Sequence, residues 1–288
     1  MDSKPRKVLQ IVEPQPVVEG AGVRLKRVFP GGALDYPDPF LLFDHFGSDD
    51  PDDYLAGFPM HPHRGIETVT YMLAGAVQHK DSIGNSGVIE AGDVQWMTAG
   101  GGIMHEEMPQ QRQGRMAGFQ LWVNLPARLK MTQPRYQEFT VDQIPEVTRE
   151  DGVTVRVIAG TVNGVSGPVA EIAADPVYMD VTLPAGAAFS HPIQRGHTAL
   201  AYVFEGEGTF GVTDQADGET VSSPRLIVFD DGDTVEVQAG GGAVRFLVMS
   251  GQPSHEPIVR YGPFVMNTRE EIQQALRDLG NGTFVWRE

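Results

Sequence analysis

Short runs of β-branched and aromatic residues recur along this chain, separated by glycine, proline, aspartate and asparagine. Examples are ETVTYMLAG, DVQWMTAG, FQLWVNL, VTVRVIAG, VYMDVTL, TALAYVFEG, RLIVFDDGD and AVRFLVMSG. Runs of this length and composition, bounded by turn-forming residues, are typical of β-strands. The 34 glycines and 21 prolines of the sequence fit a fold with many turns. The chain is therefore predicted to be all-β, a sandwich or barrel of many short strands.

One segment near the C-terminus, TREEIQQALRDLG, has the pattern of a short helix instead. Thr268 is a suitable N-cap, and Glu271 three residues later completes a capping box. Gly280 suits the position just after the end of the helix. The apolar residues have the spacing of one buried helix face, and they are Ile272, Ala275, Leu276 and Leu279.

The sequence also repeats itself weakly over a long distance. HPHRGIETVTYMLAG (61–75) aligns with HPIQRGHTALAYVFEG (191–206) if one residue is inserted. Further on, AGGGIMHEE (99–107) resembles AGGGAVRFL (239–247). The same order of elements, used twice, predicts two similar domains in tandem.

A break in the strand pattern marks the predicted boundary between these domains. The stretches ARLKMTQPRYQEF and DQIPEV interrupt the β runs near residues 130–145. We therefore expect a first domain of residues 1–137, which holds the metal-ligand candidates described below. The second domain is expected to comprise residues 138–288 and to lack a complete metal site. A chain of 288 residues is long enough for two ordinary domains.

Composition narrows the classes of function. The net charge of −16 repels phosphate backbones, so direct binding to nucleic acid is not expected. The absence of cysteine excludes disulfides, thiol catalysis and zinc–thiolate sites. The N-terminal stretch MDSKPRKVLQIVEPQPVVEG lacks the apolar region of a signal peptide. No apolar window approaches the roughly 20 residues of a membrane span, and we expect a cytoplasmic protein.

Two pairs of potential metal ligands have the spacing of a β-strand. His61 and His63 flank Pro62 at the start of an apolar run. His105 and Glu107 follow a triple-glycine turn. Because residues i and i+2 of a strand point to the same face, two facing strands would bring all four side chains together. Three imidazoles and one carboxylate suit a first-row divalent metal such as Fe, Mn, Co, Ni or Cu.

The second repeat serves as an internal control for this interpretation. In the alignment, Arg245 replaces His105 and Leu247 replaces Glu107. Residues that one repeat lacks are not needed for folding, which favours a metal site over hydrogen-bonded groups of the core or surface. The other histidines of the two repeats are interpreted as structural, the last two as partially exposed loop residues: His45, His79, His191 and His197.

Four stretches resemble the pirin family of the cupin superfamily. They are DPFLLFDHFG, FPMHPHRGIETVTYMLAG, GDVQWMTAGGGIMHEEMP and GPFVMNTREEIQQAL, and they run over nearly the whole chain. The resemblance implies a bicupin, two tandem jelly-roll β-barrels with a metal only in the N-terminal one. It implies iron, Fe(II), with Mn, Co, Ni, Cu or Zn as alternatives. It carries the metal ligands of the family onto His61, His63, His105 and Glu107.

The resemblance also implies a reaction, because some pirins use O2 to open the central ring of the flavonol quercetin. A quercetin 2,3-dioxygenase-like oxidoreductase would need a proton acceptor for the flavonol 3-hydroxyl, and Glu107 or Glu67 is expected in that role. On one continuous strand, Glu67 would share the ligand face with His63, where it could instead orient a ligand imidazole. Candidates for an aromatic-binding wall are Phe46, Phe58, Met60 and Trp96.

Two other functions stay open at this point. The chain could be a metal-dependent regulatory module that binds a protein partner, since fold alone does not determine function. It could also be a metal-bearing scaffold without turnover. Substrate-dependent consumption of O2 separates the dioxygenase from both alternatives.

Overall fold

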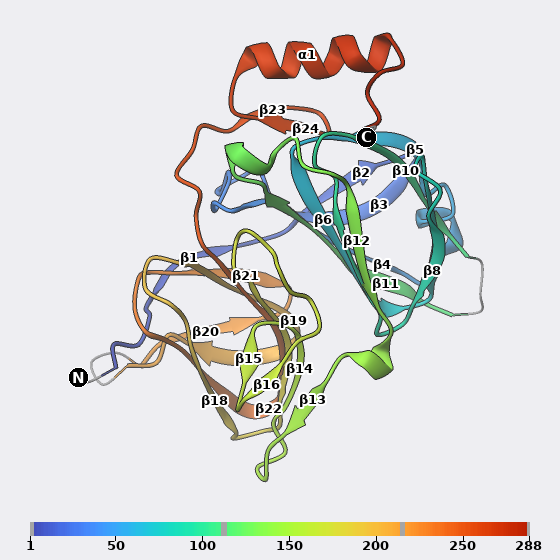
Figure 1. Cartoon of the computed structure of the whole chain (residues 1–288). Coiled ribbons are helices and arrows are strands. Elements are labelled where there is room, and N and C mark those ends of the chain that lie inside the picture. Colours follow the sequence, from blue (N-terminus) through green and yellow to red (C-terminus); the bar gives the residue numbers. More distant parts are fainter. Residues whose placement is uncertain (1–2, 111–113, 214–216, 287–288) are drawn as a thin grey trace. The chain divides into compact units, whose positions relative to one another are not determined.

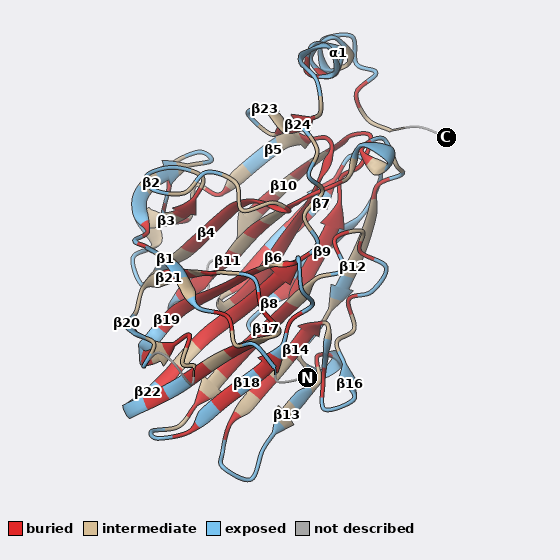
Figure 2. Cartoon of the chain, turned by 90° about the vertical axis from the view of Figure 1, so that its left-hand side faces the viewer, coloured by how far each residue is buried: buried red, intermediate tan, exposed pale blue. Residues whose placement is uncertain are grey.

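The computed structural model describes residues 3–110, 114–213 and 217–286 of the chain (Figure 1). Most of its elements are β-strands, and the prediction of an all-β fold is confirmed. Every run of β-branched and aromatic residues quoted above coincides with a strand for most of its length. Buried residues concentrate on the strands, whereas turns and the C-terminal helix are largely exposed (Figure 2).

The strands form two compact units, each made of two separate segments. The first unit combines Gln15–Val141 with Ser254–Glu288, and the second unit combines Met1–Pro14 with Asp142–Pro253. The change of unit after Val141 lies close to the expected boundary at residue 137. These units differ at both termini from the two continuous halves that we expect from the sequence, because each terminal segment belongs to the unit built by the other half of the chain.

The first unit contains two main antiparallel sheets. The seven-stranded sheet has the order β12-β9-β6-β11-β4-β3-β2, and the four-stranded sheet has the order β5-β10-β7-β8. The chain changes repeatedly from one sheet to the other, as in a jelly roll. The strands are β2 (Gln15–Glu19), β3 (Val23–Phe29), β4 (Phe40–Ser48), β5 (Phe58–His63), β6 (Ile66–Ala74), β7 (Ala76–Asp81), β8 (Ser86–Glu90), β9 (Val94–Thr98), β10 (Ile103–Pro109), β11 (Met116–Asn124) and β12 (Arg135–Phe139).

The second unit is built around two long strands, β19 (Thr198–Phe210) and β22 (Thr234–Gly251). The N-terminal part of β22 pairs with β18 (Ala188–Pro192), and its C-terminal part pairs with β17 (Val177–Leu183). The single strand β22 therefore has a different neighbour, β18 or β17, along each half of its length. The remaining strands are β1 (Val8–Val12), β13 (Glu146–Thr148), β14 (Thr154–Ala159), β15 (Thr161–Val162), β16 (Val165–Ser166), β20 (Glu219–Ser222) and β21 (Arg225–Phe229).

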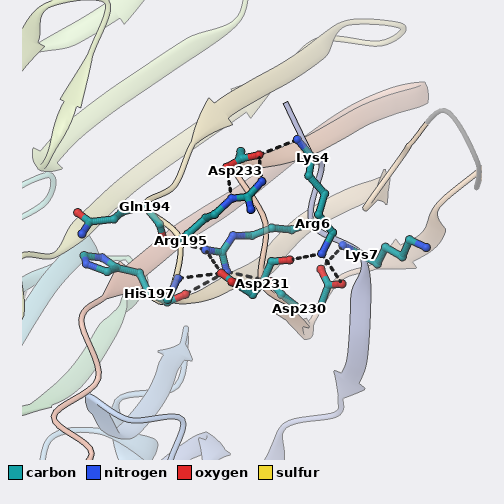
Figure 3. A network of polar contacts seen from close by, with 10 residues as sticks. Lys4, Arg6, Lys7, Gln194, Arg195, His197, Asp230, Asp231 and Asp233 are labelled. Carbon is teal, nitrogen blue, oxygen red and sulfur yellow. Dashed lines mark hydrogen bonds and ion pairs between the residues drawn. The ribbon is translucent and has the colours of Figure 1, made fainter. Parts of the chain in front are cut away.

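The N-terminal segment is held in the second unit by strand pairing and by a buried arginine (Figure 3). β1 pairs antiparallel with β21. Arg6, only 1% exposed, donates hydrogen bonds to the main-chain carbonyls of Gln194 (2.9 Å), His197 (3.0 Å) and Asp230 (2.9 Å). Buried carbonyl groups need such partners. The N-terminal residues therefore complete a unit whose other strands come from the second half of the chain.

The predicted C-terminal helix is present as α1 (Arg269–Gly280). Its N-cap is Thr268, and the capping box with Glu271 is confirmed. The predicted C′ position is wrong, because the helix includes Gly280 and is capped by Asn281. Two of the four apolar positions, Leu276 and Leu279, are exposed. At 12 residues α1 is too short to cross a membrane, and no longer apolar helix occurs in the described part of the chain.

Candidate metal centre

Three of the predicted ligands converge in the first unit. His61 and His63 lie on β5 and His105 lies on β10, where antiparallel pairing sets His105 opposite His61. The Nε2 atoms of His61 and His63 are 3.0 Å apart. The ring centroid of His105 is 4.4 Å from that of His61 and 5.0 Å from that of His63. The three imidazoles present nitrogens that all lie within 4.8 Å of one another.

The surroundings of these imidazoles fit a metal ion. Burial lowers the pKa of His63 and of His105 well below the ordinary value. Both side chains are therefore neutral near pH 7, the form that coordinates metals. Among the described residues, neither ring nitrogen of His105 has a hydrogen-bond partner. Buried polar atoms without partners are rare and call for an ion, a water or a ligand, so the histidine group could hold a divalent transition metal.

Glu107 lies beside the histidine group rather than within it. The register between β10 and β5 shifts after His105, so that Glu107 lies opposite Phe58. The Glu107 carboxylate is not among the atoms that cluster within 4.8 Å, and it accepts a hydrogen bond from Thr70 Oγ1 at 3.1 Å. Burial raises the pKa of Glu107, although the charge of His61 and the hydrogen bond from Thr70 act in the opposite direction.

Glu67 occupies a different place from the one that its offset from His63 predicted. β5 ends at His63 and β6 begins at Ile66, and the two strands belong to different sheets. Gly65 turns the chain between them with a φ of +80°. The assumption of one continuous strand is therefore wrong. Glu67 is buried, accepts a hydrogen bond from Thr98 Oγ1 at 2.7 Å, and has a pKa raised by burial.

A cavity of about 370 Å³ opens beside His63 and Glu107. Its volume is in the range of small-molecule sites. Two of the four residues predicted for an aromatic wall, Phe46 and Phe58, line this cavity, and the described lining residues include neither Met60 nor Trp96. Glu67 is also outside the lining. The full lining consists of Glu19, Gly20, Leu25, Arg27, Leu42, Asp44, Phe46, Phe58, His63, Glu107, Gln120, Trp122, Arg260, Gly262 and Pro263.

Trp122 was not predicted from the sequence, although it contacts a candidate ligand. It lies on β11, and its ring stands edge-on to the imidazole of His63, with the centroids 5.0 Å apart and an interplanar angle of 85°. The run FQLWVNL was recognised as a strand, and alternation along it gives the face on which Trp122 lies. Nothing in the run, however, indicates that this face meets the face of β5.

The C-terminal segment completes the wall of the cavity. A hairpin of β23 (Val259–Tyr261) and β24 (Phe264–Met266) supplies Arg260, Gly262 and Pro263 to the lining. These residues are far from the histidines in the sequence, and reasoning from local patterns did not place them at the site. The signal that could have found them is the stretch GPFVMNTREEIQQAL, which belongs to the same family pattern as the histidine motifs.

A buried lysine and a main-chain hydrogen bond hold this hairpin against the turn that follows β5. Lys130 Nζ donates to the carbonyls of Gly65 (2.9 Å) and Val265 (2.8 Å). Arg64 Nη1 pairs with Asp278 Oδ2 of α1 at 2.7 Å. Val265 N in turn donates to the Arg64 carbonyl. The position of the hairpin, and hence of the cavity wall, is fixed by groups adjacent to the histidine group.

In the second unit, a valine stands where the first unit has His105. β18 pairs with β22 as β5 pairs with β10. His191, the residue aligned with His61, lies opposite Val235, and Phe189 lies opposite Val237. Both valines are buried in the core of the unit. This pairing makes Val235 the structural counterpart of His105.

This placement corrects the sequence alignment that assigned Arg245 and Leu247 as counterparts of the ligands. The glycines at 240–242 lie inside the continuous strand β22, whereas the similar glycines at 100–102 form the turn before β10. The expectation that His191 and His197 are partially exposed is also wrong. Both are buried, with exposed fractions of 4% and 7%.

Comparisons with known proteins agree with this description. The sequence model named Pirin matches residues 22–123, and that of the Pirin C-terminal cupin domain matches residues 178–285. A "Pirin-like protein" of Caulobacter vibrioides is 50% identical over 280 residues, which cover 97% of this chain and 99% of that protein. A Pseudomonas aeruginosa protein named "Putative quercetin 2,3-dioxygenase" is 46% identical over 286 residues, covering 96% and 97%.

A solved structure extends the similarity to the whole fold. The crystal structure of quercetin 2,3-dioxygenase from Acinetobacter baumannii matches with a TM-score of 0.88 at 36% identity, covering 97% of this chain and 98% of that one. The match spans both units, and the bicupin architecture implied by the motifs is confirmed. This chain belongs to the pirin family.

Proposed function

We propose that this chain is a mononuclear non-haem iron protein that acts as a dioxygenase on a flavonol such as quercetin. The observation that carries the proposal is the group of three imidazoles next to an aromatic cavity of about 370 Å³. The names of the relatives in P. aeruginosa and A. baumannii support the same class of reaction. In such a reaction O2 is consumed and the central ring of the flavonol opens.

The donor set determines which residues would hold the metal. His61, His63 and His105 offer neutral nitrogens, and we assign Glu107 as the fourth donor. Its carboxylate lines the cavity beside His63. Nitrogen donors with one carboxylate favour a transition metal over magnesium or calcium. When bound, Fe(II) supplies Lewis acidity that stabilises the oxyanion of a flavonol.

The protein's own groups would bind and deprotonate the substrate. Phe46, Phe58 and Trp122 give the cavity flat apolar surfaces against which aromatic rings pack. Glu107 would accept the proton of the 3-hydroxyl, because burial raises the pKa of its carboxyl group and a base is more effective when its pKa is closer to the working pH. Glu67 is not proposed for this role, since it lies outside the cavity lining and bonds to Thr98.

Oxygen consumption tests this proposal directly. Protein loaded anaerobically with Fe(II) is mixed with quercetin and air-saturated buffer, and O2 uptake is recorded together with bleaching of the flavonol. The expected result is one O2 consumed per quercetin. A His63→Ala variant that keeps its circular dichroism spectrum is expected to show neither signal. No uptake by protein that holds one iron per chain would contradict a dioxygenase and leave the metal-dependent protein-binding role as the next hypothesis to test.

A further inference from the structure

One arginine in the cavity stands close to the candidate metal ligands. Arg260 lies on β23 and lines the cavity. Its Cζ atom is 4.8 Å from the ring centroid of Trp122, and the ring centroid of His63 is 5.0 Å from that same centroid. One indole ring therefore contacts both the guanidinium and a candidate ligand imidazole. Stacking on an indole also restricts the orientation of the guanidinium.

The other arginine of the cavity is fully engaged by acidic side chains. Arg27 Nε and Nη2 donate to the two carboxylate oxygens of Asp44 at 2.9 and 2.8 Å. Arg27 Nη1 donates to Glu19 Oε1 at 2.6 Å. These two carboxylates and this guanidinium form a closed network on the wall, so Arg27 offers no strong donor to a ligand.

Arg260 differs in its hydrogen bonds. Its Nε donates to the Gly262 carbonyl at 3.0 Å. Among the described residues, its two terminal Nη groups have no hydrogen-bond partner. A guanidinium presents these groups as a planar fork that matches a carboxylate. The strongest anion-binding edge of the stacked, half-buried Arg260 is therefore unpaired in a residue that lines the cavity.

The charge of Arg260 also acts on the histidine group. The Arg260 guanidinium and the His63 imidazole both contact the ring of Trp122, so a positive charge lies near the histidine group. A cation near this group would attract an anionic part of a substrate. The charge of Arg260 also acts on Asp44, but the carboxylates of Asp44 and Glu19 form their hydrogen bonds with Arg27.

We propose that the cavity selects an aromatic substrate with a second anionic group, a carboxylate or an ionised phenol, and that Arg260 binds this group. The aromatic rings would pack beside Trp122, with one oxygen at the histidine group and the second anion at Arg260. The inference rests on the proposed function, since it concerns the substrate of the same site. Arg260 is a specificity-determining residue in this arrangement.

Two naphthalene probes test the proposal without any turnover. Naphthalene-2,6-dicarboxylate carries two carboxylates, and 2-naphthoate carries one. Their affinities for protein verified to hold one nickel ion per chain are measured by isothermal titration calorimetry. We expect the dicarboxylate to bind about tenfold more tightly or better, the gain typical of a charge-assisted bidentate hydrogen bond. Equal affinities of the two probes for the unsubstituted protein would overturn the proposal.

Substitutions of Arg260 test whether this residue causes the preference for the dicarboxylate probe. In Arg260→Gln the preference for the dicarboxylate is expected to disappear, and in Arg260→Lys part of it is expected to remain. Arg24→Gln is the matched control, because it removes the same charge from a side chain that is 74% exposed and pairs with Asp53. An unchanged preference in Arg260→Gln would overturn the proposal. These affinities do not depend on flavonol chemistry, so a failure of quercetin turnover alone leaves this result standing.

Discussion

Arg64 Nη1 lies 2.7 Å from Asp278 Oδ2, and this ion pair connects the residue after His63 to the last turn of α1. Arg64 is 3% exposed. It also donates to the carbonyls of Gly101 (2.6 Å) and Phe284 (3.1 Å). The C-terminal helix is thereby coupled to the backbone that positions one of the candidate metal ligands.

Breaking this ion pair should weaken the metal site. In Asp278→Asn, Arg64 keeps its bonds to main-chain carbonyls but loses its charged partner, and the segment after His63 becomes less restrained. We expect the affinity for nickel to fall about fivefold, since a partly buried ion pair contributes on the order of 1 kcal/mol. Competition with a metal-binding dye measures this change. Glu270→Gln, on the exposed first turn of α1, is the control, and an equal effect in both variants would argue against the coupling.

Two buried glutamates should respond differently to the same substitution. Glu107→Gln removes an anionic donor beside the histidine group, and the nickel affinity is expected to fall about tenfold or more. Glu67→Gln keeps the shape of a residue outside the cavity lining, with an oxygen that can still accept from Thr98. Its metal affinity is expected to stay within a factor of two. Titration of both variants with nickel shows which carboxylate is the metal donor. A larger loss of nickel affinity in Glu67→Gln than in Glu107→Gln would assign that role to Glu67.

Removing the buried arginine of the N-terminal segment should destabilise the second unit. Arg6→Ala leaves the carbonyls of Gln194, His197 and Asp230 without their donors, which costs on the order of 3 kcal/mol. Chemical denaturation followed by circular dichroism measures the loss, and hydrogen exchange in β1 shows whether the segment detaches. Arg149→Ala, whose guanidinium is exposed and donates to Ala188, should cost less than about 1 kcal/mol.

The buried histidine of β18 predicts a pH dependence of stability. Burial lowers the pKa of His191 to about 4, whereas an unfolded histidine titrates near ~6.5. The unfolded state binds the proton first as pH falls, so the contribution of His191 is complete above pH ~6.5 and declines towards pH 4 by up to about 3 kcal/mol. In His191→Phe, whose ring can still stack on Phe189, the free energy of unfolding should change less between pH ~6.5 and pH 4 than in the parent chain.

The measurement for His191 is the free energy of unfolding at several pH values between 4 and 7, compared between the parent chain and each variant. Other groups titrate in the same range, and the difference between two curves isolates a single residue. The exposed His255 provides the control variant His255→Asn. Parallel curves for the parent chain and His191→Phe would contradict the prediction.

Local patterns in the sequence determined the elements of this protein and half of its candidate site. β-branched runs between turn residues specify strands because strand formation and turn chemistry depend on neighbouring residues. For the same reason Thr268 and Glu271 identified the start of α1. The spacing of His61 and His63 placed both imidazoles on one face, since the two-residue period of a strand is a property of the backbone itself.

Interruptions of these regular elements were harder to foresee. The turn at Gly65 separates Glu67 from the strand of His63, and an extra residue of β5 shifts its register with β10 between His105 and Glu107. In the second unit, glycines that resemble a turn lie within β22. Each interruption depends on how a strand pairs with a partner elsewhere in the chain, and a single stretch of sequence does not contain that information.

Only the tertiary structure decided which distant segments complete each unit. The hairpin that brings Arg260 to the cavity is held by Lys130, α1 is held by Arg64, and the N-terminal strand is held by Arg6. These buried cations are stable where they are because carbonyls and carboxylates from several parts of the chain surround them. The sequence by itself determined the strands, the helix and the paired histidines, whose patterns are local. Long-range burial and hydrogen bonding decided which unit each terminal segment joins and which residues complete the wall of the cavity. No local pattern encodes these contacts.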